Sequence, residues 1–341
     1  MKKFSELQEF VEKRTCVKVG IYNDDRFLGQ NLLITPLINE LGAIFENDCL
    51  IYIIAPQEIH EFWLNSIYNI ALYNLAEECE IDFDIFLALT HKRSFLISPP
   101  KISTKVLIAE NFHDNTAYWD SHIVFNYSFD LAEFAANKKL DDMYLAHRYI
   151  IYATPWMTKL LINNEPALNY PIKEENISSV LRYFKNNDIY SMSKIFLNLG
   201  GISNSTWRDH NKYIELARKV LTNLNVCLIL NNGPNEIDIN SKFILELDAY
   251  KDRIYLPKNE KFDINQTAAI IKSCQLVVTK DTGIFHLANA VGSNTIVFTH
   301  YYADHKLWLF PAKNIKIIMS SNECTDPGID EIFNEIKNSI L

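Results

Sequence analysis

The sequence predicts an α/β fold made of two Rossmann-like domains, each with a parallel sheet covered by helices. Short apolar runs alternate with amphipathic stretches in both halves of the chain, which is the pattern of such sheets. A stretch richer in Asn, Pro, Lys and Glu, at about 154–192, separates the two series. The 341 residues also exceed the usual size of a single core. We therefore expect a first domain over 1–160, a connecting segment over 161–190 and a second domain over 191–341.

In the first half, apolar runs predict strands at 17–22, 50–55, 84–89 and 105–109. A helix should follow the polar turn at 23–30, because leucines recur there at helical spacing, with Pro36 tolerated in its first turns. A second amphipathic helix is expected from Ile59 to Ile70. The alternation of these elements favours a parallel sheet.

The second half repeats the pattern. Strands are expected at 195–199, 226–230, 275–279 and 295–298, with helices at about 212–224 and from Gly328 to the end. The run from Ile177 to Phe184 indicates a helix within the connecting segment. A further helix should begin at the polar turn that follows 275–279.

Composition limits the class of protein. A net charge of −9 argues against general nucleic-acid binding. No apolar run approaches the roughly 18 residues that span a bilayer, and no signal-peptide core follows Met1. None of the six cysteines pair at metal-binding spacing. We expect a cytoplasmic chain with reduced, buried thiols and no bound metal or cofactor.

Three loops at strand ends in the second half carry polar side chains suited to a phosphate-bearing ligand. The first offers Gly201, Ser203, Thr206 and Arg208, whose backbone, hydroxyls and guanidinium can bind phosphate oxygens. The second offers Glu236 or Asp238 to hold ribose hydroxyls. The third is a helix start, where unpaired N–H groups favour an anion; it contains Asp281, Thr282, Gly283 and His286. Each loop alone could be an ordinary turn or cap, so the prediction rests on their joint placement at one sheet edge.

The segment Asp-Thr-Gly-x-x-His-Leu-Ala-x-Ala-x-Gly, at 281–292, resembles the ADP-heptose:lipopolysaccharide heptosyltransferase family. Segments 28–37, 84–94 and 142–149 are similar to further segments of that family. The resemblance implies the GT-B fold, in which two Rossmann-like domains face each other across a cleft. It also implies inverting, metal-independent transfer of a heptose from ADP-heptose to an acceptor sugar of the lipopolysaccharide core, by an enzyme that needs no cofactor.

The resemblance also implies roles for residues on the donor side. Asp281, Thr282, Gly283 and His286 would contact the diphosphate and sugar, and Glu236 would hold the nucleoside. The family's lysine before a Trp-Pro pair has no counterpart at 205–208, where Arg208 could supply the cation. Lys92 and Arg93 would face an anionic acceptor, the alternative being a solvated basic turn.

The expected catalytic base differs from the family pattern. The family carries an aspartate directly after the glycine of its first loop, and this chain has Gln30 there. Glutamine cannot take a proton at neutral pH. Asp24 and Asp25 lie just upstream and are candidate bases, or else acids that cap the turn.

Two other functions therefore stay open. One is a GT-B transferase with another nucleotide sugar as donor and another glycan as acceptor. The other is a catalytically impaired member that binds a sugar nucleotide or a partner protein. A lipopolysaccharide acceptor would be compatible with peripheral contact at the inner face of the inner membrane.

Overall fold

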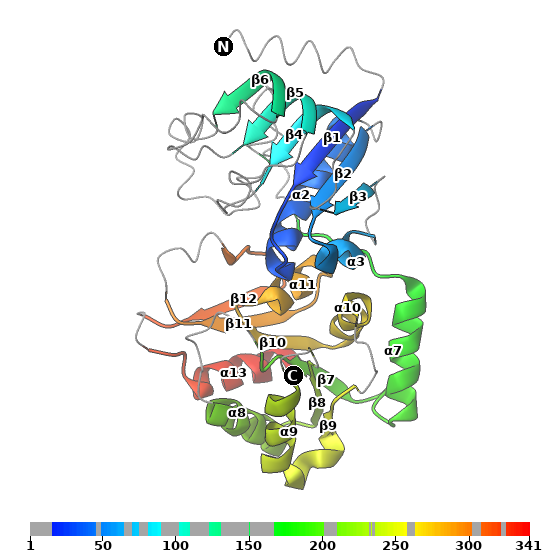
Figure 1. The fold of residues 1–341 in the computed structure, drawn as a ribbon. Coiled ribbons are helices and arrows are strands. Elements are labelled where there is room, and N and C mark those ends of the chain that lie inside the picture. The colour runs from blue at the N-terminus through cyan, green and yellow to red at the C-terminus, as the bar shows by residue number, and fades with distance from the viewer. Residues whose placement is uncertain are drawn as a thin grey trace. The chain divides into compact units, whose positions relative to one another are not determined.

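The computed structural model divides the chain into two compact units, Met1–Ala167 and Leu168–Leu341 (Figure 1). It describes residues 16–45, 49–64, 70–74, 81–89, 102–109, 123–130, 150, 167–200, 210–231, 233, 236–257, 263–301, 308–321 and 325–341. No helix among these residues is both long enough and apolar enough to cross a membrane.

The first unit contains a six-stranded parallel sheet with the order β3-β2-β1-β4-β5-β6. Its elements are β1 (Val17–Tyr22), α2 (Leu28–Ile44), β2 (Cys49–Ala55), η1 (Gln57–Ile59), α3 (His60–Trp63), β3 (Ile70–Asn74), β4 (Asp82–Ala88), β5 (Ile102–Ala109) and β6 (Ile123–Asp130). The central strand β1 pairs with β2 and β4, and the buried Val19 lies opposite Ile51 and Ile85. The four predicted strands are confirmed, whereas β3 and β6 had not been predicted.

The position of Pro36 in helix α2 differs from the prediction. The helix begins at Leu28, so Pro36 lies in its interior and not in its first turns. Proline has no N–H to bond the carbonyl four residues earlier, that of Leu32. The hydroxyl of Thr35 donates to this carbonyl instead, at 2.7 Å. The helix therefore continues through the proline because its neighbour satisfies the orphaned acceptor.

The helix expected from Ile59 to Ile70 is shorter than predicted. Helix α3 ends at Trp63, and Ile70 opens strand β3, where it pairs with Ile51. Residues 65–69 lie outside the described part of the chain. The prediction was wrong at Ile70 because an isoleucine that fits helical spacing suits the start of a strand equally well.

The second unit contains another six-stranded parallel sheet, with the order β12-β11-β10-β7-β8-β9. Its elements are α7 (Glu174–Asn186), β7 (Ser193–Leu197), α8 (His210–Asn223), β8 (Val226–Leu230), α9 (Ile237–Glu246), η4 (Asp248–Arg253), β9 (Ile254–Tyr255), α10 (Ile264–Ser273), β10 (Leu276–Lys280), α11 (Gly283–Ala290), β11 (Thr295–Thr299), β12 (Ile315–Met319) and α13 (Ile329–Ile340). The predicted strands and helices are present. Elements α9, η4, β9, α10 and β12 had not been predicted.

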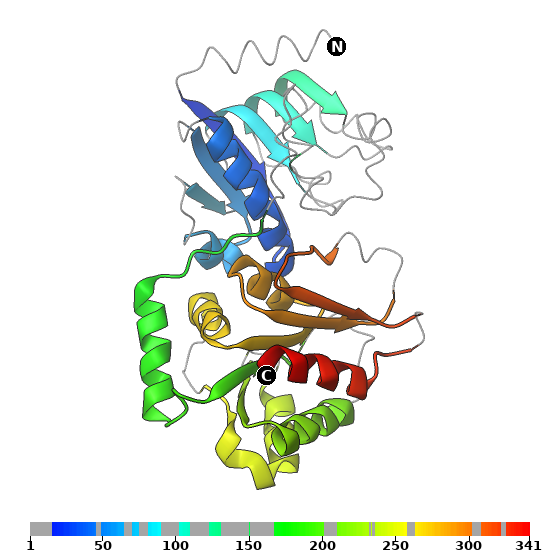
Figure 2. The same cartoon turned by 180° about the vertical axis from the view of Figure 1, so that it is seen from behind.

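Helices cover both faces of this sheet (Figures 1 and 2). Helix α8 packs against α9 and α13 on one face, and α10 packs against α7 and α11 on the other. On the α8 face the core includes Tyr213, Val278 and Phe298, all fully buried. The stretch expected as a connection over 161–190 therefore contributes helix α7 to the second unit.

The cysteines are free thiols wherever the structure describes them. Cys49, Cys227 and Cys274 are buried and Cys16 is exposed. Burial raises the pKa of Cys227 to about 11, so its thiol is protonated at neutral pH and unreactive. The expectation of buried thiols is confirmed for these three strand-associated cysteines, and Cys79 and Cys324 lie outside the described residues.

Candidate functional site

The centre of the second sheet is the place where a ligand is expected to bind. Strands β7 and β10 are neighbours, and the chain leaves β7 toward α8 on one face but leaves β10 toward α11 on the other. In open α/β sheets such a reversal of strand order opens a crevice at the carboxyl ends of the strands. The side chains at these strand ends are therefore the candidates for binding.

Asn198 connects the carboxyl ends of three strands. It directly follows β7, and its amide nitrogen lies 3.0 Å from the Thr279 hydroxyl and 3.2 Å from the Thr282 hydroxyl. Its oxygen accepts a hydrogen bond from Nδ2 of Asn231 at 3.2 Å, at the end of β8. Both asparagines are buried. This network holds the ends of β7, β8 and β10 in one arrangement.

Glu236 is anchored by the same network. Its Oε2 accepts a hydrogen bond from Nδ2 of Asn231 at 3.0 Å. A side chain at Gly200 or at Gly233 would collide with the Glu236 carboxylate, so these two glycines make room for it. The carboxylate therefore lies over the ends of β7 and β8, in the crevice.

Opposing effects act on the pKa of the Glu236 carboxyl group. Burial raises the pKa of the Glu236 carboxyl, while hydrogen bonds from Gly233 and Asn231 and the charge of Lys280 act in the opposite direction. A carboxylate held in this way can accept two hydrogen bonds from vicinal hydroxyls, which is the chemistry of ribose binding.

Thr282 caps the helix that follows β10. Its backbone is extended, and its hydroxyl accepts a hydrogen bond from the N–H of Ile284 at 3.3 Å. Helix α11 then begins at Gly283, beside Asn198. The first turn of a helix presents N–H groups and the positive end of the helix dipole, which together favour an anion such as phosphate.

His286 lies one turn into α11 and is buried. Its Nε2 lies 4.0 Å from Oδ1 of Asp281, and its Nδ1 has no hydrogen-bond partner within the described residues. Burial lowers the pKa of His286, with Asp281 acting in the opposite direction. The imidazole is therefore neutral at pH 7 and can exchange hydrogen bonds without adding positive charge.

This burial makes stability depend on pH. Because the pKa of His286 is lowered in the folded chain, the unfolded chain binds the proton more readily below about pH 6.5, so the free energy of unfolding decreases as pH falls. Chemical unfolding measured between pH 7 and pH 5 should give a slope that His286→Gln reduces, by up to about 1.4 kcal/mol per pH unit. An unchanged slope in His286→Gln would refute this assignment.

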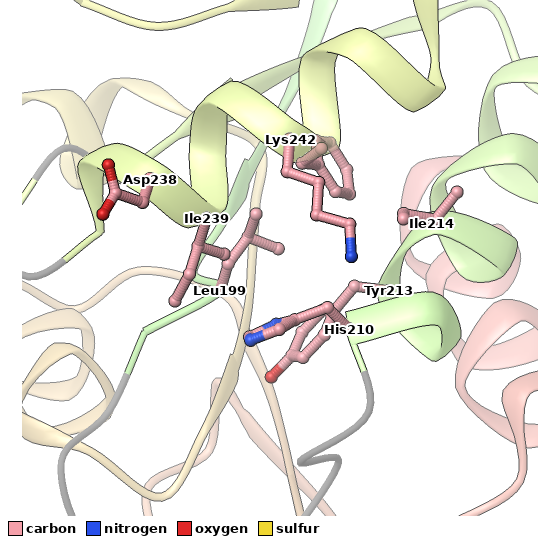
Figure 3. Close-up of a pocket in the computed structure, with 8 residues that line it drawn as sticks. Leu199, His210, Tyr213, Ile214, Asp238, Ile239 and Lys242 are labelled. Atoms are coloured by element: carbon pink, nitrogen blue, oxygen red, sulfur yellow. The ribbon is translucent and has the colours of Figure 1, made fainter.

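Asp238, the alternative to Glu236, lies in a different place. It is in the first turn of α9 and lines a cavity of about 190 Å³ between α8 and α9 (Figure 3). The cavity walls are mainly apolar, and Lys242 and His210 project into the space between the helices (Figure 3). The network of Asn198 and Asn231 therefore includes Glu236, whereas Asp238 belongs to this separate cavity.

In the first unit, Asn31 organises the loop after β1. Its Oδ1 accepts hydrogen bonds from Asn23 at 2.9 Å and from the Trp63 indole at 3.1 Å. Its Nδ2 donates to the carbonyl oxygens of Asp25 and Phe27, each at 2.9 Å. The loop and the start of α2 are therefore held rigidly at the carboxyl end of the central strand.

The three candidate catalytic positions lie on this loop and helix start. Asp25 is buried, and its Oδ1 accepts the Phe27 N–H at 2.7 Å. Asp24 is half-buried and close enough to Tyr22 to contribute, after burial, to the raised pKa of that phenol. Gln30 is buried in the first turn of α2.

Other predicted site residues lie outside the described part of the chain. They are Lys92, Arg93, Gly201, Ser203, Thr206 and Arg208. Asn198, Asn231 and Lys280 lie at these strand ends but had not been predicted as site residues. An asparagine directly after a buried strand, repeated at β7 and β8, is the signal that could have found the first two.

Comparison with known proteins finds a family match within the second unit. Residues 196–328 match the model of glycosyltransferase family 9 (heptosyltransferase). No protein of curated function matches the chain in sequence.

Several solved structures are similar over nearly the whole chain. E. coli ADP-heptose lps heptosyltransferase II is 14% identical with a TM-score of 0.70, and the match covers 95% of this chain and 98% of that one. A glycosyl transferase family 9 protein from Veillonella parvula DSM 2008 is 13% identical with a TM-score of 0.69, covering 94% and 91%. E. coli heptosyltransferase WaaC with ADP-2-deoxy-2-fluoro heptose is 12% identical with a TM-score of 0.65, covering 94% and 99%.

At these identities the likeness is evidence of the fold, and the expected GT-B architecture with two parallel sheets is confirmed. The family match covers the strand ends that carry Asn198, Glu236 and Thr282. The chain therefore has the GT-B fold, and its residues 196–328 match glycosyltransferase family 9 (heptosyltransferase).

Proposed function

We propose that the protein transfers a heptose from ADP-heptose to an acceptor sugar of the lipopolysaccharide core, with inversion and without a metal ion. The second domain, expected over 191–341, would bind the donor, and the first, expected over 1–160, would bind the acceptor. The observation that carries the proposal is the placement of Glu236, Asn198 and Thr282 at one crevice inside the family 9 domain.

Each of these groups suits one part of a nucleotide sugar. The Glu236 carboxylate accepts hydrogen bonds from the ribose hydroxyls. The N-terminus of α11, with the Thr282 hydroxyl and the N–H of Gly283, binds the diphosphate. Asp281 and His286 lie at the same helix start and would contact the sugar or its phosphates. Arg208 would add a cation from the preceding loop.

The reaction then needs two kinds of assistance. The acceptor hydroxyl attacks the anomeric carbon, the bond from that carbon to the diphosphate oxygen breaks, and the configuration inverts. The departing diphosphate gains negative charge, which the groups around α11 stabilise. A carboxylate takes the proton of the attacking hydroxyl. We assign this role to Asp24 in preference to Asp25, because Asp24 is the more exposed of the two and so the easier for an acceptor to reach.

A second function is favoured by Gln30. Gln30 is buried, at the position where the heptosyltransferase family that this chain resembles has its base. The chain could therefore bind a sugar nucleotide without transferring the sugar. Gln30→Asp separates the two functions. If transfer is absent in the parent and present in this variant, the parent is a binding protein.

Calorimetric titration tests the donor. We expect ADP and ADP-heptose to bind, UDP and UDP-sugars to bind more weakly, and EDTA to leave both binding and transfer unchanged. Failure of ADP and ADP-heptose to bind at millimolar concentration would contradict the heptose assignment. Preferential binding of UDP-sugars would favour a GT-B transferase with another donor. Because a lipopolysaccharide acceptor is lipid-linked, the proposal places the protein in the cytoplasm, at the inner face of the inner membrane.

A further inference from the structure

The second sheet contains two buried lysines at opposite ends of its central strands. Lys194 lies near the start of β7 and Lys280 at the end of β10, and both are about 95% buried or more. The ammonium of Lys194 donates hydrogen bonds to the backbone carbonyls of Tyr190 and Met192. These two carbonyls therefore compensate the buried charge of Lys194, at the end of the sheet that lies away from the crevice.

Lys280 differs from Lys194 in the contacts of its ammonium. Within the described residues, its ammonium makes no hydrogen bond and no ion pair. Its Nζ lies 5.7 Å from the centre of the Tyr213 ring of α8. Asp326, one of two carboxylates whose charge acts on Lys280, is already paired with Lys212 at 2.6 Å. The other carboxylate is that of Glu236, which Asn231 holds.

The strand pattern places this ammonium beneath the crevice. Side chains alternate along a strand, so Lys280 shares a face with Leu276 and Val278, which pack with Tyr213 in the α8 core. Lys280 is the last residue of β10, and the next residues, Asp281 and Thr282, form the turn before α11. The charge therefore lies between the strand end and α8, at the point where the strand order reverses.

An unpaired ammonium in this position weakens the folded state. Removing a cation from water is costly unless an anion or hydrogen-bond acceptor compensates. Burial lowers the pKa of Lys280, while Asp326 and Glu236 act against this effect. A leucine or methionine would fill the space without this cost. An anionic ligand that binds the ammonium would explain why a lysine occupies this position.

We propose that Lys280 binds the diphosphate of the nucleotide-sugar donor, together with the N-terminus of α11. The proposal rests on the donor site described above and adds to it a residue that carries a positive charge. Lys280 would neutralise the diphosphate in the bound donor and stabilise the negative charge that develops when the sugar leaves.

Lys280→Met tests the proposal by two measurements, since the affinity for ADP should decrease while the thermal stability increases. In calorimetry the dissociation constant for ADP should rise about tenfold or more, as for loss of a charge-assisted hydrogen bond. The affinity for adenosine, measured in competition with ADP, should stay within about threefold. The ligand-free variant should melt a few degrees higher than the parent, because a buried unpaired charge has been removed.

Lys194→Met is the matched control, since it removes a buried lysine whose charge is satisfied. It should lower the melting temperature, because two carbonyl groups lose their donor, and leave the ADP affinity unchanged. Lys280→Arg keeps the charge and should recover part of the ADP affinity. Lys280→Gln provides a second neutral variant should the methionine variant fail to fold.

The outcomes separate this inference from the proposed function. Equal ADP affinity in the parent and in the neutral Lys280 variants would overturn the role of Lys280 and leave the donor site standing. An equal loss of ADP and adenosine affinity would also overturn it, because the effect would then not involve phosphate. Absence of ADP binding by the parent would overturn the proposed function and this inference with it.

Discussion

Glu236→Gln is expected to weaken the binding of ADP by about a hundredfold, corresponding to loss of two hydrogen bonds from ribose hydroxyls to a charged acceptor. The variant keeps the size of the side chain, and its amide oxygen can still accept from Asn231, so the network around Asn198 should survive. Calorimetry with ADP and with 2′-deoxy-ADP measures the effect. The penalty should be smaller for 2′-deoxy-ADP, which lacks one of the two hydroxyls.

Two further variants control for indirect effects. Glu246→Gln removes an exposed carboxylate at the end of α9, the helix that Glu236 precedes, and should leave ADP affinity unchanged. Gly200→Ala introduces a methyl group where the Glu236 carboxylate lies, so it should displace that side chain and reproduce much of the loss. A Glu236→Gln variant with parental affinity for both nucleotides would show that the carboxylate does not hold the ribose.

Asp24→Asn is expected to lower kcat for sugar transfer by about 10²- to 10⁴-fold, the range for loss of a general base. The donor dissociation constant should not change, because the donor groups lie on the second unit. Steady-state transfer assays with ADP-heptose and calorimetry with ADP measure the two quantities. Asp25→Asn is the comparison, since an asparagine oxygen can still accept the Phe27 N–H and the loop should persist.

The two aspartates give distinguishable results. A large loss only in Asp24→Asn supports the assignment of the base. A large loss only in Asp25→Asn, with the fold intact, would move the role to Asp25. Full activity in both variants of an active parent would exclude both residues, and Gln30→Asp would then show whether the first turn of α2 is the position of the base.

The central strands of both sheets could be predicted because their apolar runs are bounded by polar turns. Sequence analysis missed β9, which has only two residues, Ile254–Tyr255, too short for any periodic pattern. It also missed α10, although Asp263 caps that helix by accepting the N–H of Gln266 at 2.7 Å. An aspartate three residues before a glutamine is a helix-start signal that could have been used.

Part of the candidate site could be predicted from local sequence patterns, whereas the rest depends on tertiary contacts. A helix start that suits phosphate has a local pattern, so the segment from Asp281 to His286 could be proposed from neighbouring residues alone. The choice of Glu236 over Asp238 depends on which carboxylate meets Asn231, and this contact is tertiary. Lys280 was missed because a lysine ending a strand looks like a solvated residue, and only the packing of α8 over it reveals its burial.

A crystal structure of the protein with ADP would show whether the crevice between β7 and β10 binds the donor. We predict the ribose at the Glu236 carboxylate and the diphosphate between Lys280 Nζ and the first turn of α11, beside Thr282. ADP in the cavity that Asp238 and Lys242 line, or a diphosphate away from α11, would contradict the account.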